Sequence, residues 1–380
     1  MECTQIPIIP YREFSYPLHD EAARKNIPIV GELDLTMRCN LSCAHCYCFQ
    51  DINKKELDFD EVCRILNEIT EAGCLWLLFT GGEPFIRPDF LDIYTYAKKK
   101  GLIITIFTNG TLITSEIADY LKEWPPFSVE ISLYGATQET YEKVTGVVGS
   151  YKKCLDGIEM LLKCKIPLKL KTLVTKLNRH ELWMMKRYAE ERDLDFRFDA
   201  LINPRLDGSN KPCQLRISPY EAVEIDLADS RRRESWEKLY KECAGSLTRR
   251  IDVLYPCSLN MWSFHITAYG ELHHCLIAQE PSFNLRQKSF SKSWKELITE
   301  FQTIKSGEKN KCKECELFPL CAPCPAWAKL ENGNPNIIVE YTCQIAHLLV
   351  EALRREEIIL KGGDIDGKES KKTLQETCSI

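Results

Sequence analysis

The sequence lacks several features that would indicate whole classes of protein. It contains no apolar run that approaches the roughly 18 residues of a membrane-spanning helix. The N-terminus has no charged-then-apolar export signal. The net charge of -5 provides no overall basic field, which argues against a general nucleic-acid binder. These absences predict a cytoplasmic protein that binds neither membranes nor nucleic acid.

Cysteine, by contrast, is abundant, with 19 among the 380 residues. Without an export signal, so many thiols favour metal or redox centres over a framework of disulfides. A chain of this length, 44% hydrophobic and 28% charged, can form a large core and more than one domain. Four cysteines lie within helical or strand patterns and are expected to be small core residues: Cys63, Cys74, Cys154 and Cys164.

Three cysteines, Cys39, Cys43 and Cys46, follow an alternating run that predicts a strand, so we expect them in the loop after it. Three thiolates can hold three irons of a cubane cluster, whereas an ordinary electron-transfer cluster has four cysteine ligands. One iron would stay open for another ligand. A zinc site that combines these thiols with His45 is the alternative. Cys48 follows closely and has no assigned role.

A second motif, Gly81-Gly82-Glu83-Pro84, directly follows a run that predicts a buried strand. Paired glycines let a backbone approach a ligand closely, and a carboxylate beside them can hold an ammonium group. Together with the three cysteines, this motif resembles the radical SAM superfamily. The resemblance implies a 4Fe-4S cluster whose open iron binds S-adenosyl-L-methionine (SAM), and reductive cleavage of SAM to a 5'-deoxyadenosyl radical. It also implies that the motif contacts the methionine amine.

Helix and strand patterns alternate from residue 58 to about residue 199. Asp58 can cap one helix, and Asn178 with Glu181 at the third helical position indicates another capped start. Strands alternating with helices predict right-handed crossovers and a parallel sheet. The expected fold class is α/β: a partial (β/α)6 TIM-type barrel, as the resemblance implies, followed by a small cysteine-rich α+β iron-sulfur domain. The strands are expected at 32–37, 75–80, 102–107, 128–133, 168–174 and 194–198.

The loops that follow parallel strands gather at one face of such a barrel. The cysteine loop, Gly81-Gly82-Glu83-Pro84, Asn109, Ser132 and 172–175 should therefore lie near one face. The resemblance places Asn109 and Ser132 near the ribose and carboxylate of SAM. The alternative is that these two side chains merely cap strand ends.

The C-terminal third contains seven cysteines at short spacings: Cys257, Cys275, Cys312, Cys315, Cys321, Cys324 and Cys343. They resemble the SPASM extension of a subset of radical SAM enzymes, which binds one or two auxiliary iron-sulfur clusters. The resemblance implies one cluster on Cys312, Cys315, Cys321 and Cys343, and another on Cys257, Cys275 and Cys324.

This chain departs from the SPASM pattern in two places. Cys321 and Cys324 are separated by two residues, where three are common, and 250–256 contains no cysteine. The cluster with Cys257 therefore needs Cys243, or it has an open iron or a smaller form. A zinc ribbon on Cys312, Cys315, Cys321 and Cys324 is the alternative.

The expected domains are an N-terminal extension (1–28), the barrel (29–200), a helical linker (201–256), the auxiliary-cluster domain (257–358) and a disordered tail (359–380). The short segment before the barrel is too small for a leader-peptide domain. Any leader peptide would then bind directly or through a separate leader-binding protein.

The resemblance implies an enzyme that abstracts hydrogen from a peptide or protein side chain, as in ribosomal peptide maturation, with a reductant such as flavodoxin or ferredoxin. A sulfatase-maturing relative has Asp where this chain has Leu276, so that dehydrogenation is disfavoured. The alternatives are modification of a tetrapyrrole or other small molecule, such as decarboxylation of a haem precursor, and a non-enzymatic iron-sulfur or zinc scaffold. Four candidate acids and bases are not distinguished from ordinary surface or core residues: Asp199, His265, His273 and His274.

Overall fold

The computed structural model describes residues 11–243, 253–255, 257, 262–308, 310–321 and 323–360. The chain divides into two compact units. Unit 1 comprises 1–217, 252–309 and 324–337, and unit 2 comprises 218–251, 310–323 and 338–380. These units cut across the predicted domain boundaries, because much of the expected auxiliary-cluster domain belongs to the unit that contains the barrel strands.

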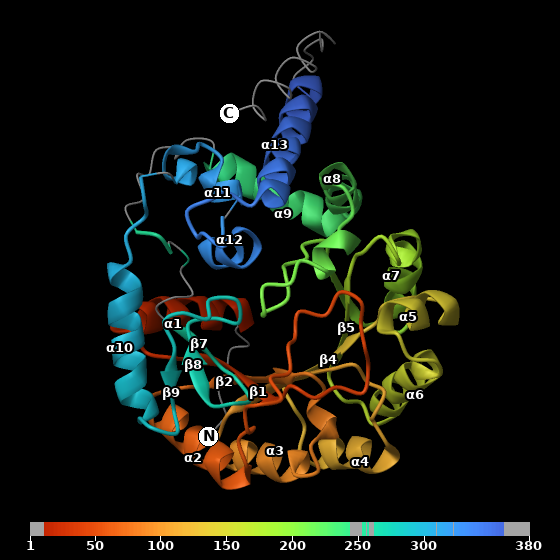
Figure 1. Cartoon of the computed structure of the whole chain (residues 1–380). Coiled ribbons are helices and arrows are strands. Elements are labelled where there is room, and N and C mark those ends of the chain that lie inside the picture. Colours follow the sequence, from red (N-terminus) through yellow and green to blue (C-terminus); the bar gives the residue numbers. More distant parts are fainter. Residues whose placement is uncertain are drawn as a thin grey trace, which may run out of the picture. The chain divides into compact units, whose positions relative to one another are not determined.

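One nine-stranded sheet organises the described part of unit 1, in the order β6-β5-β4-β3-β2-β1-β7-β8-β9 (Figure 1). Strands β1 to β6 pair in parallel in chain order, which confirms the predicted parallel sheet. The sheet is open between β6 and β9 in the described residues, as a partial barrel requires. The strands are β1 Val30–Thr36, β2 Trp76–Gly81, β3 Ile103–Thr108, β4 Ser128–Ser132, β5 Leu168–Leu173, β6 Asp195–Asp199, β7 Ser263–Ile266, β8 Glu271–His273 and β9 Phe283–Asn284.

The last three strands extend this sheet. β7 pairs in parallel with β1, and β8 and β9 continue it in antiparallel fashion. β7 and β8 form a hairpin with Gly270 in its turn, and this hairpin continues the barrel sheet. This pairing brings a segment far along the chain beside the strand that precedes the cysteine loop.

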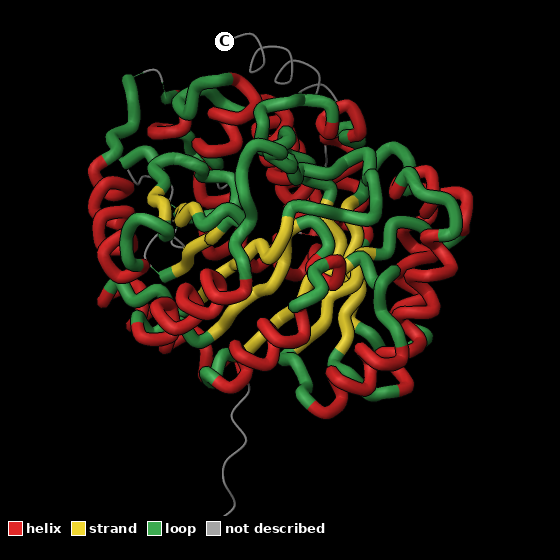
Figure 2. The backbone as a smooth tube through the Cα atoms, turned by 60° about the horizontal axis from the view of Figure 1, so that its bottom comes forward, coloured by secondary structure: helices red, strands yellow, loops and turns green. Residues whose placement is uncertain are grey.

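Helices cover the outer side of the sheet, as Figure 2 shows for the segments between the strands. Asp58 caps α2, as predicted, and forms a capping box with Glu61 that was not predicted; the periodic apolar residues of α2 are buried. Helices α1, α5, α10 and α12 were not predicted. The helices of unit 1 are α1 Tyr11–Lys25, α2 Phe59–Glu71, α3 Phe90–Lys99, α4 Ser115–Glu123, α5 Gln138–Thr145, α6 Ser150–Lys163, α7 Leu182–Glu190, α10 Phe290–Thr303 and α12 Pro325–Asn332.

The predicted capping box at Asn178 is wrong. The Asn178 side chain accepts hydrogen bonds from the backbone and hydroxyl of Thr175, at 2.7 and 3.0 Å, and does not cap the helix. The Glu181 carboxylate accepts from the hydroxyls of Thr137 and Thr140 instead. Neither side chain caps the start of the helix, because each forms hydrogen bonds elsewhere. A short 3-10 turn, Arg179–Glu181, precedes α7.

Unit 2 is helical in its described part. Its elements are α8 Pro219–Ala228, α9 Ser230–Cys243, the 3-10 turn η5 Lys311–Glu314, α11 Phe318–Cys321 and α13 Glu340–Leu360. Its core joins Val223 and Leu227 of α8 to Leu349 and Leu353 of α13. α8 and α9 lie within the segment predicted as a helical linker. Of the predicted tail (359–380), residues 359 and 360 belong to α13, and 361–380 lie outside the described residues. Within the described ranges, the chain has no helix of the length and apolarity that a membrane crossing requires.

Candidate functional site

The cysteine loop, which carries Cys39, Cys43 and Cys46, packs directly on the paired glycines at the end of β2. The amide of Gly82 donates to the Thr36 carbonyl at 2.7 Å, and the amide of Glu83 donates to the Arg38 carbonyl at 2.9 Å. A Cβ on Gly82 would lie only 2.2 Å from the Arg38 oxygen. Only glycine permits this approach. The two sequence motifs therefore form one structural unit.

The three thiols of the loop are close enough to influence one another's ionisation. Burial raises the pKa of Cys39 and Cys43, and neighbouring thiols raise both further. Hydrogen bonds from the Cys48 side chain and backbone lower the pKa of Cys46, which favours the thiolate form that binds metals. The Cys48 sulfur also contacts the Gly81 carbonyl at 3.5 Å. Cys48 thus connects the cysteine loop to the glycine motif.

Asn109 lies against the cysteine loop, at the end of β3. Its amide nitrogen donates to Asn40 Oδ1 at 2.9 Å and lies 3.8 Å from Cys39 Sγ. Its Oδ1 accepts from the backbone and hydroxyl of Thr111. Because the protein engages both polar ends of this side chain, Asn109 holds the loop in position. Contact with the ribose of SAM stays a prediction.

Ser132 ends β4, and its hydroxyl hydrogen-bonds to Tyr134. Burial raises the pKa of Tyr134, and the three thiols of the cysteine loop raise it further. The Tyr134 ring packs on the ring of His45, with centroids 4.5 Å apart. Burial lowers the pKa of His45 to about 4, so this imidazole is neutral. Tyr134 therefore belongs to the wall of the site. The only sequence signal for it was its place just after a predicted strand.

Glu83 is fully buried, and the protein itself uses its carboxylate. One oxygen accepts from the Thr108 hydroxyl at 2.7 Å, and the other accepts from the Asn109 amide at 2.7 Å. Burial raises the pKa of Glu83 to about 7, although these hydrogen bonds oppose the shift. Glu83 thus ties the glycine motif to the end of β3. Pairing with the ammonium group of SAM stays a prediction, and it would compete with these bonds.

A row of charged side chains lies on one face of the sheet, which we name the inner face: Glu32, Asp34, Glu130, Lys171, Arg197 and His265. Strand alternation places Asp34 on the face opposite the buried Leu33 and Leu35. Strand register aligns Glu32 with His265, and Lys171 with Arg197. The inner face therefore brings together ionisable groups from five strands.

His265 and Asp34 form a buried pair on the inner face. His265 Nε2 lies 3.0 Å from Asp34 Oδ2, and their side chains are 1% and 2% exposed. Burial lowers the pKa of His265, but the charges of Asp34 and Glu32 outweigh it and leave the pKa raised. In the described part of the chain, Asp34 Oδ1 and His265 Nδ1 have no hydrogen-bond partner. Of the four predicted acid-base candidates, His265 alone has both a charged partner and such an unpaired atom.

The other three candidates contact ring side chains or the backbone. His273 lies beside His265, with ring centroids 6.0 Å apart, and burial lowers its pKa to about 3. His274 packs on Phe301, with centroids 3.9 Å apart, and burial lowers its pKa to about 4. Asp199 accepts the backbone amide of Leu201 at 2.8 Å and so caps the turn after β6.

The lysine and the arginine of the inner face both pair with Glu130. Lys171 Nζ lies 3.6 Å and Arg197 3.5 Å from its carboxylate. Burial lowers the pKa of Lys171 well below its usual range, and Glu130 partly offsets this effect. Within the described ranges, Glu32 and Asp34 form no ion pair with Lys or Arg. The inner face therefore carries Glu32, Asp34 and His265 near β1, and two cations that share one carboxylate near β5 and β6.

The predicted set Cys257, Cys275 and Cys324 converges around Tyr255 in unit 1. Burial raises the pKa of Tyr255 to about 12, and these three thiols raise it further. Cys275 and Cys324 also pack against one apolar cluster. The side chain of Cys243, the predicted alternative for a fourth ligand, lies outside the described residues.

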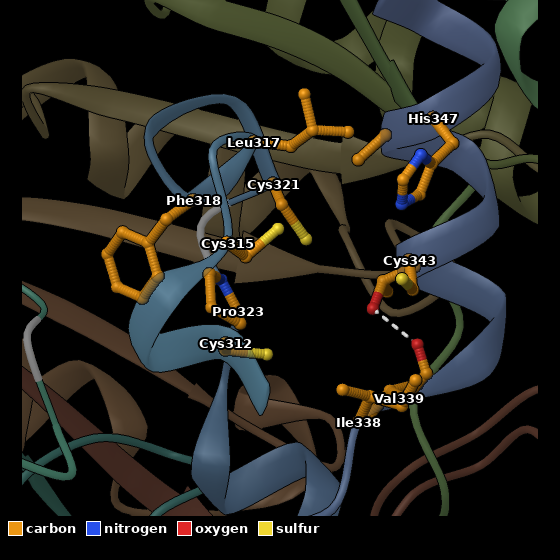
Figure 3. Close-up of a pocket in the computed structure, with 12 residues that line it drawn as sticks. Cys312, Cys315, Leu317, Phe318, Cys321, Pro323, Ile338, Val339, Cys343 and His347 are labelled. Atoms are coloured by element: carbon orange, nitrogen blue, oxygen red, sulfur yellow. Dashed lines mark hydrogen bonds between the residues drawn. The ribbon is translucent and has the colours of Figure 1, made fainter. Parts of the chain in front are cut away.

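The predicted set of four cysteines lines one pocket in unit 2, which we name the four-cysteine pocket (Figure 3): Cys312, Cys315, Cys321 and Cys343. Burial raises the pKa of Cys321 to about 12 and that of Cys312 to about 11, and the neighbouring thiols contribute to both shifts. Most other lining residues are apolar. Four sulfurs facing one apolar space are a donor set that fits an iron-sulfur cluster. The zinc-ribbon grouping differs, because Cys324 belongs to unit 1 and Cys343 is the fourth thiol here.

Comparison with known proteins shows the family of this chain and its similarity to named enzymes. The family model "Radical SAM superfamily" matches residues 33–189. "AdoMet-dependent heme synthase" of Methanosarcina barkeri is 26% identical over 347 residues, which is 82% of this chain and 95% of that protein. "Probable GTP 3',8-cyclase" of Pyrococcus horikoshii is 32% identical over 261 residues, which is 65% of this chain and 83% of that protein.

A solved structure with a similar fold is Streptococcus suis SuiB bound to its precursor peptide SuiA. It superposes with a TM-score of 0.64 at 16% identity, and the match covers 90% of this chain and 83% of SuiB. At this identity the similarity shows the fold alone.

We predict that Glu83→Gln removes a pH dependence of stability. Because the folded pKa of Glu83 is about 7 against a usual 4.5, the folded protein binds more protons than the unfolded chain between these values. The free energy of unfolding then falls as pH rises from 4.5 to 7. A shift of this size corresponds to roughly 3 kcal/mol.

The measurement is denaturant unfolding of the metal-free protein at pH 5 and pH 7.5. Wild type should lose more stability than Glu83→Gln over this interval. Glu123→Gln, at the exposed end of α4, is the surface control and should follow wild type. An equal loss in wild type and Glu83→Gln contradicts the prediction.

Proposed function

The chain belongs to the radical SAM superfamily and is an enzyme, and we propose that it cleaves SAM reductively and uses the resulting radical to abstract hydrogen from a peptide or protein side chain. Cys39, Cys43 and Cys46 would hold the 4Fe-4S cluster, which supplies the electron for this cleavage. The contact between the cysteine loop and the paired glycines is the observation that carries the proposal, because it joins a three-thiolate site to a backbone that a ligand can approach.

The charges of the inner face support a peptide substrate. Near β1 it presents Glu32 and Asp34, while Lys171 and Arg197 already pair with Glu130. Peptide amides and amines are hydrogen-bond donors, which the unpaired Asp34 Oδ1 and the nearby Glu32 can accept.

Modification of a tetrapyrrole is the second candidate. The observation that favours it is the haem synthase similarity, which extends over 82% of this chain and 95% of that protein. The solved peptide complex of SuiB resembles this chain in fold alone. The two candidates share the radical-generating site and differ in what the inner face must recognise.

The C-terminal cysteines complete the proposal. The four-cysteine pocket would hold one auxiliary iron-sulfur cluster, and the cysteines around Tyr255 would hold a second, in the manner of a SPASM extension. Such clusters supply one-electron steps, and an external reductant such as flavodoxin or ferredoxin would feed them. We place the protein in the cytoplasm, where thiols stay reduced.

We predict that replacing Cys39, Cys43 or Cys46 by Ala abolishes cleavage of SAM. Each replacement removes a ligand from the radical-generating cluster while the auxiliary sets keep theirs. The assay measures 5'-deoxyadenosine from anaerobically reconstituted protein with dithionite. Cys63→Ala, a buried thiol on α2, is the control and should keep wild-type yield. A loop variant with wild-type yield would contradict the cluster assignment.

A second prediction concerns the substrate class. Peptide and small-molecule fractions of a cell extract, each in deuterated and unlabelled form, are offered separately to the enzyme. Deuterium should reach 5'-deoxyadenosine from the peptide fraction, because the radical takes a substrate hydrogen directly. Transfer only from the small-molecule fraction would replace the peptide proposal by the tetrapyrrole candidate. The Cys43→Ala protein is the background control.

A third prediction separates the auxiliary chemistry from radical generation. Cys321→Ala removes a ligand of the four-cysteine pocket, so product formation should fail while cleavage of SAM stays measurable. Because these thiolates converge around the metal, a chelator should increase hydrogen exchange in unit 2 first. Cys164→Ala, outside both cysteine sets, is the control. Zinc in place of iron in the pocket would remove the redox role.

A further inference from the structure

The four-cysteine pocket contains one aromatic nitrogen base, His347. It lies on α13 four residues after Cys343, so the two side chains share a helix face. Figure 3 shows the imidazole directed into the pocket, toward the sulfurs of Cys321 and Cys343. Apart from the thiols and Thr342, the rest of the lining is apolar: Leu317, Phe318, Pro323, Ile338, Val339 and Ala346.

We propose that His347 donates a hydrogen bond to the iron-sulfur cluster of this pocket and thereby raises its reduction potential. The inference rests on the proposed function, since it requires the four cysteines to hold such a cluster. An imidazole carries an N–H in either neutral tautomer. Reduction adds negative charge to the cluster and its sulfurs, so an N–H directed at them stabilises the reduced form more than the oxidised form.

His347 lies at the exposed side of the pocket, so water can reach its ring. Apart from His347 and Thr342 the lining consists of thiols and apolar residues, so the sulfurs have few other side-chain donors and a single N–H directed at them changes their electrostatic surroundings. The other cysteine set faces the phenol of Tyr255 instead. The two auxiliary clusters would therefore differ in reduction potential. The cluster in the four-cysteine pocket would be easier to reduce than the same cluster without the His347 donor. That property suits an electron acceptor.

The experiment uses the full-length chain and leaves the cluster of the four-cysteine pocket as the one with a complete set of cysteine ligands. Cys39→Ala, Cys43→Ala, Cys46→Ala and Cys275→Ala are combined, so that the reconstituted protein has an intact ligand set only in the four-cysteine pocket. Iron and zinc analysis precedes the titration. Zinc or no metal in the pocket refutes the proposed cluster, which is a different failure from that of His347.

The midpoint potential is then measured by redox titration with EPR detection. In this background, His347→Phe should lower the potential, because it keeps a ring and removes the donor. His347→Gln should restore much of it, since the side-chain amide also donates. Gln344→Ala, whose side chain bonds to Glu340 on the same helix, is the control and should not change it. An unchanged potential in His347→Phe at full iron content overturns the inference.

A second measurement does not depend on the stability of His347→Phe. Pulsed EPR of the reduced centre in 15N-histidine-labelled protein should show one weak nitrogen coupling, which His347→Gln removes. No histidine coupling overturns the proposal. A strong coupling, typical of nitrogen bound to iron, also overturns it, because His347 would then be a ligand and not a hydrogen-bond donor.

Discussion

The close approach of two backbones, at Gly82 and Arg38, is the constraint on which the candidate cofactor site depends. β1 and β2 are neighbours in the sheet, and the amides of Gly82 and Glu83 continue their hydrogen bonding beyond the ends of the strands. A side chain at Gly82 would occupy the position of the Arg38 carbonyl. The separation between the thiols and the glycine motif is therefore set by backbone geometry, before any metal binds.

Glu83 extends this constraint to a third strand. Its carboxylate binds the end of β3 through Thr108 and Asn109, and Asn109 returns to the cysteine loop through Asn40. The contacts close a ring from the loop to the glycine motif, to β3, and back to the loop. Since each member of the ring holds another, the site is preorganised by hydrogen bonds that are shielded from water. A buried carboxylate is costly, and here its hydrogen bonds offset that cost.

The sequence predicted those features that local patterns determine. The six parallel strands and the helix cap at Asp58 are confirmed, because hydrophobic periodicity and capping residues agree there. The cap at Asn178 failed because the same side chain can bond to the backbone in several ways, and Thr175 was the partner present. The pairing of β7 with β1 was not predicted, since pairing between distant segments leaves no signal in local periodicity.

The charges of the inner face were missed for a different reason. Alternating apolar and polar residues normally indicate a strand with one face in water. Lys171 and Glu130 follow that pattern, but their side chains are only 16% and 15% exposed. From sequence alone, the interior of an open barrel cannot be distinguished from a solvated face, because both require polar residues at every second position.

That ambiguity bears on what the inner face is for. Asp34 and His265 are almost completely buried, and each has a polar atom without a partner in the described part of the chain. Such atoms lose the hydrogen bonds that water would give them, at a typical cost of about 1 to 3 kcal/mol each. Apolar residues at these positions would avoid the cost and pack as well. Packing alone therefore does not require charged residues at these positions, which supports the proposal that the polar face of β1 and β7 contacts a substrate.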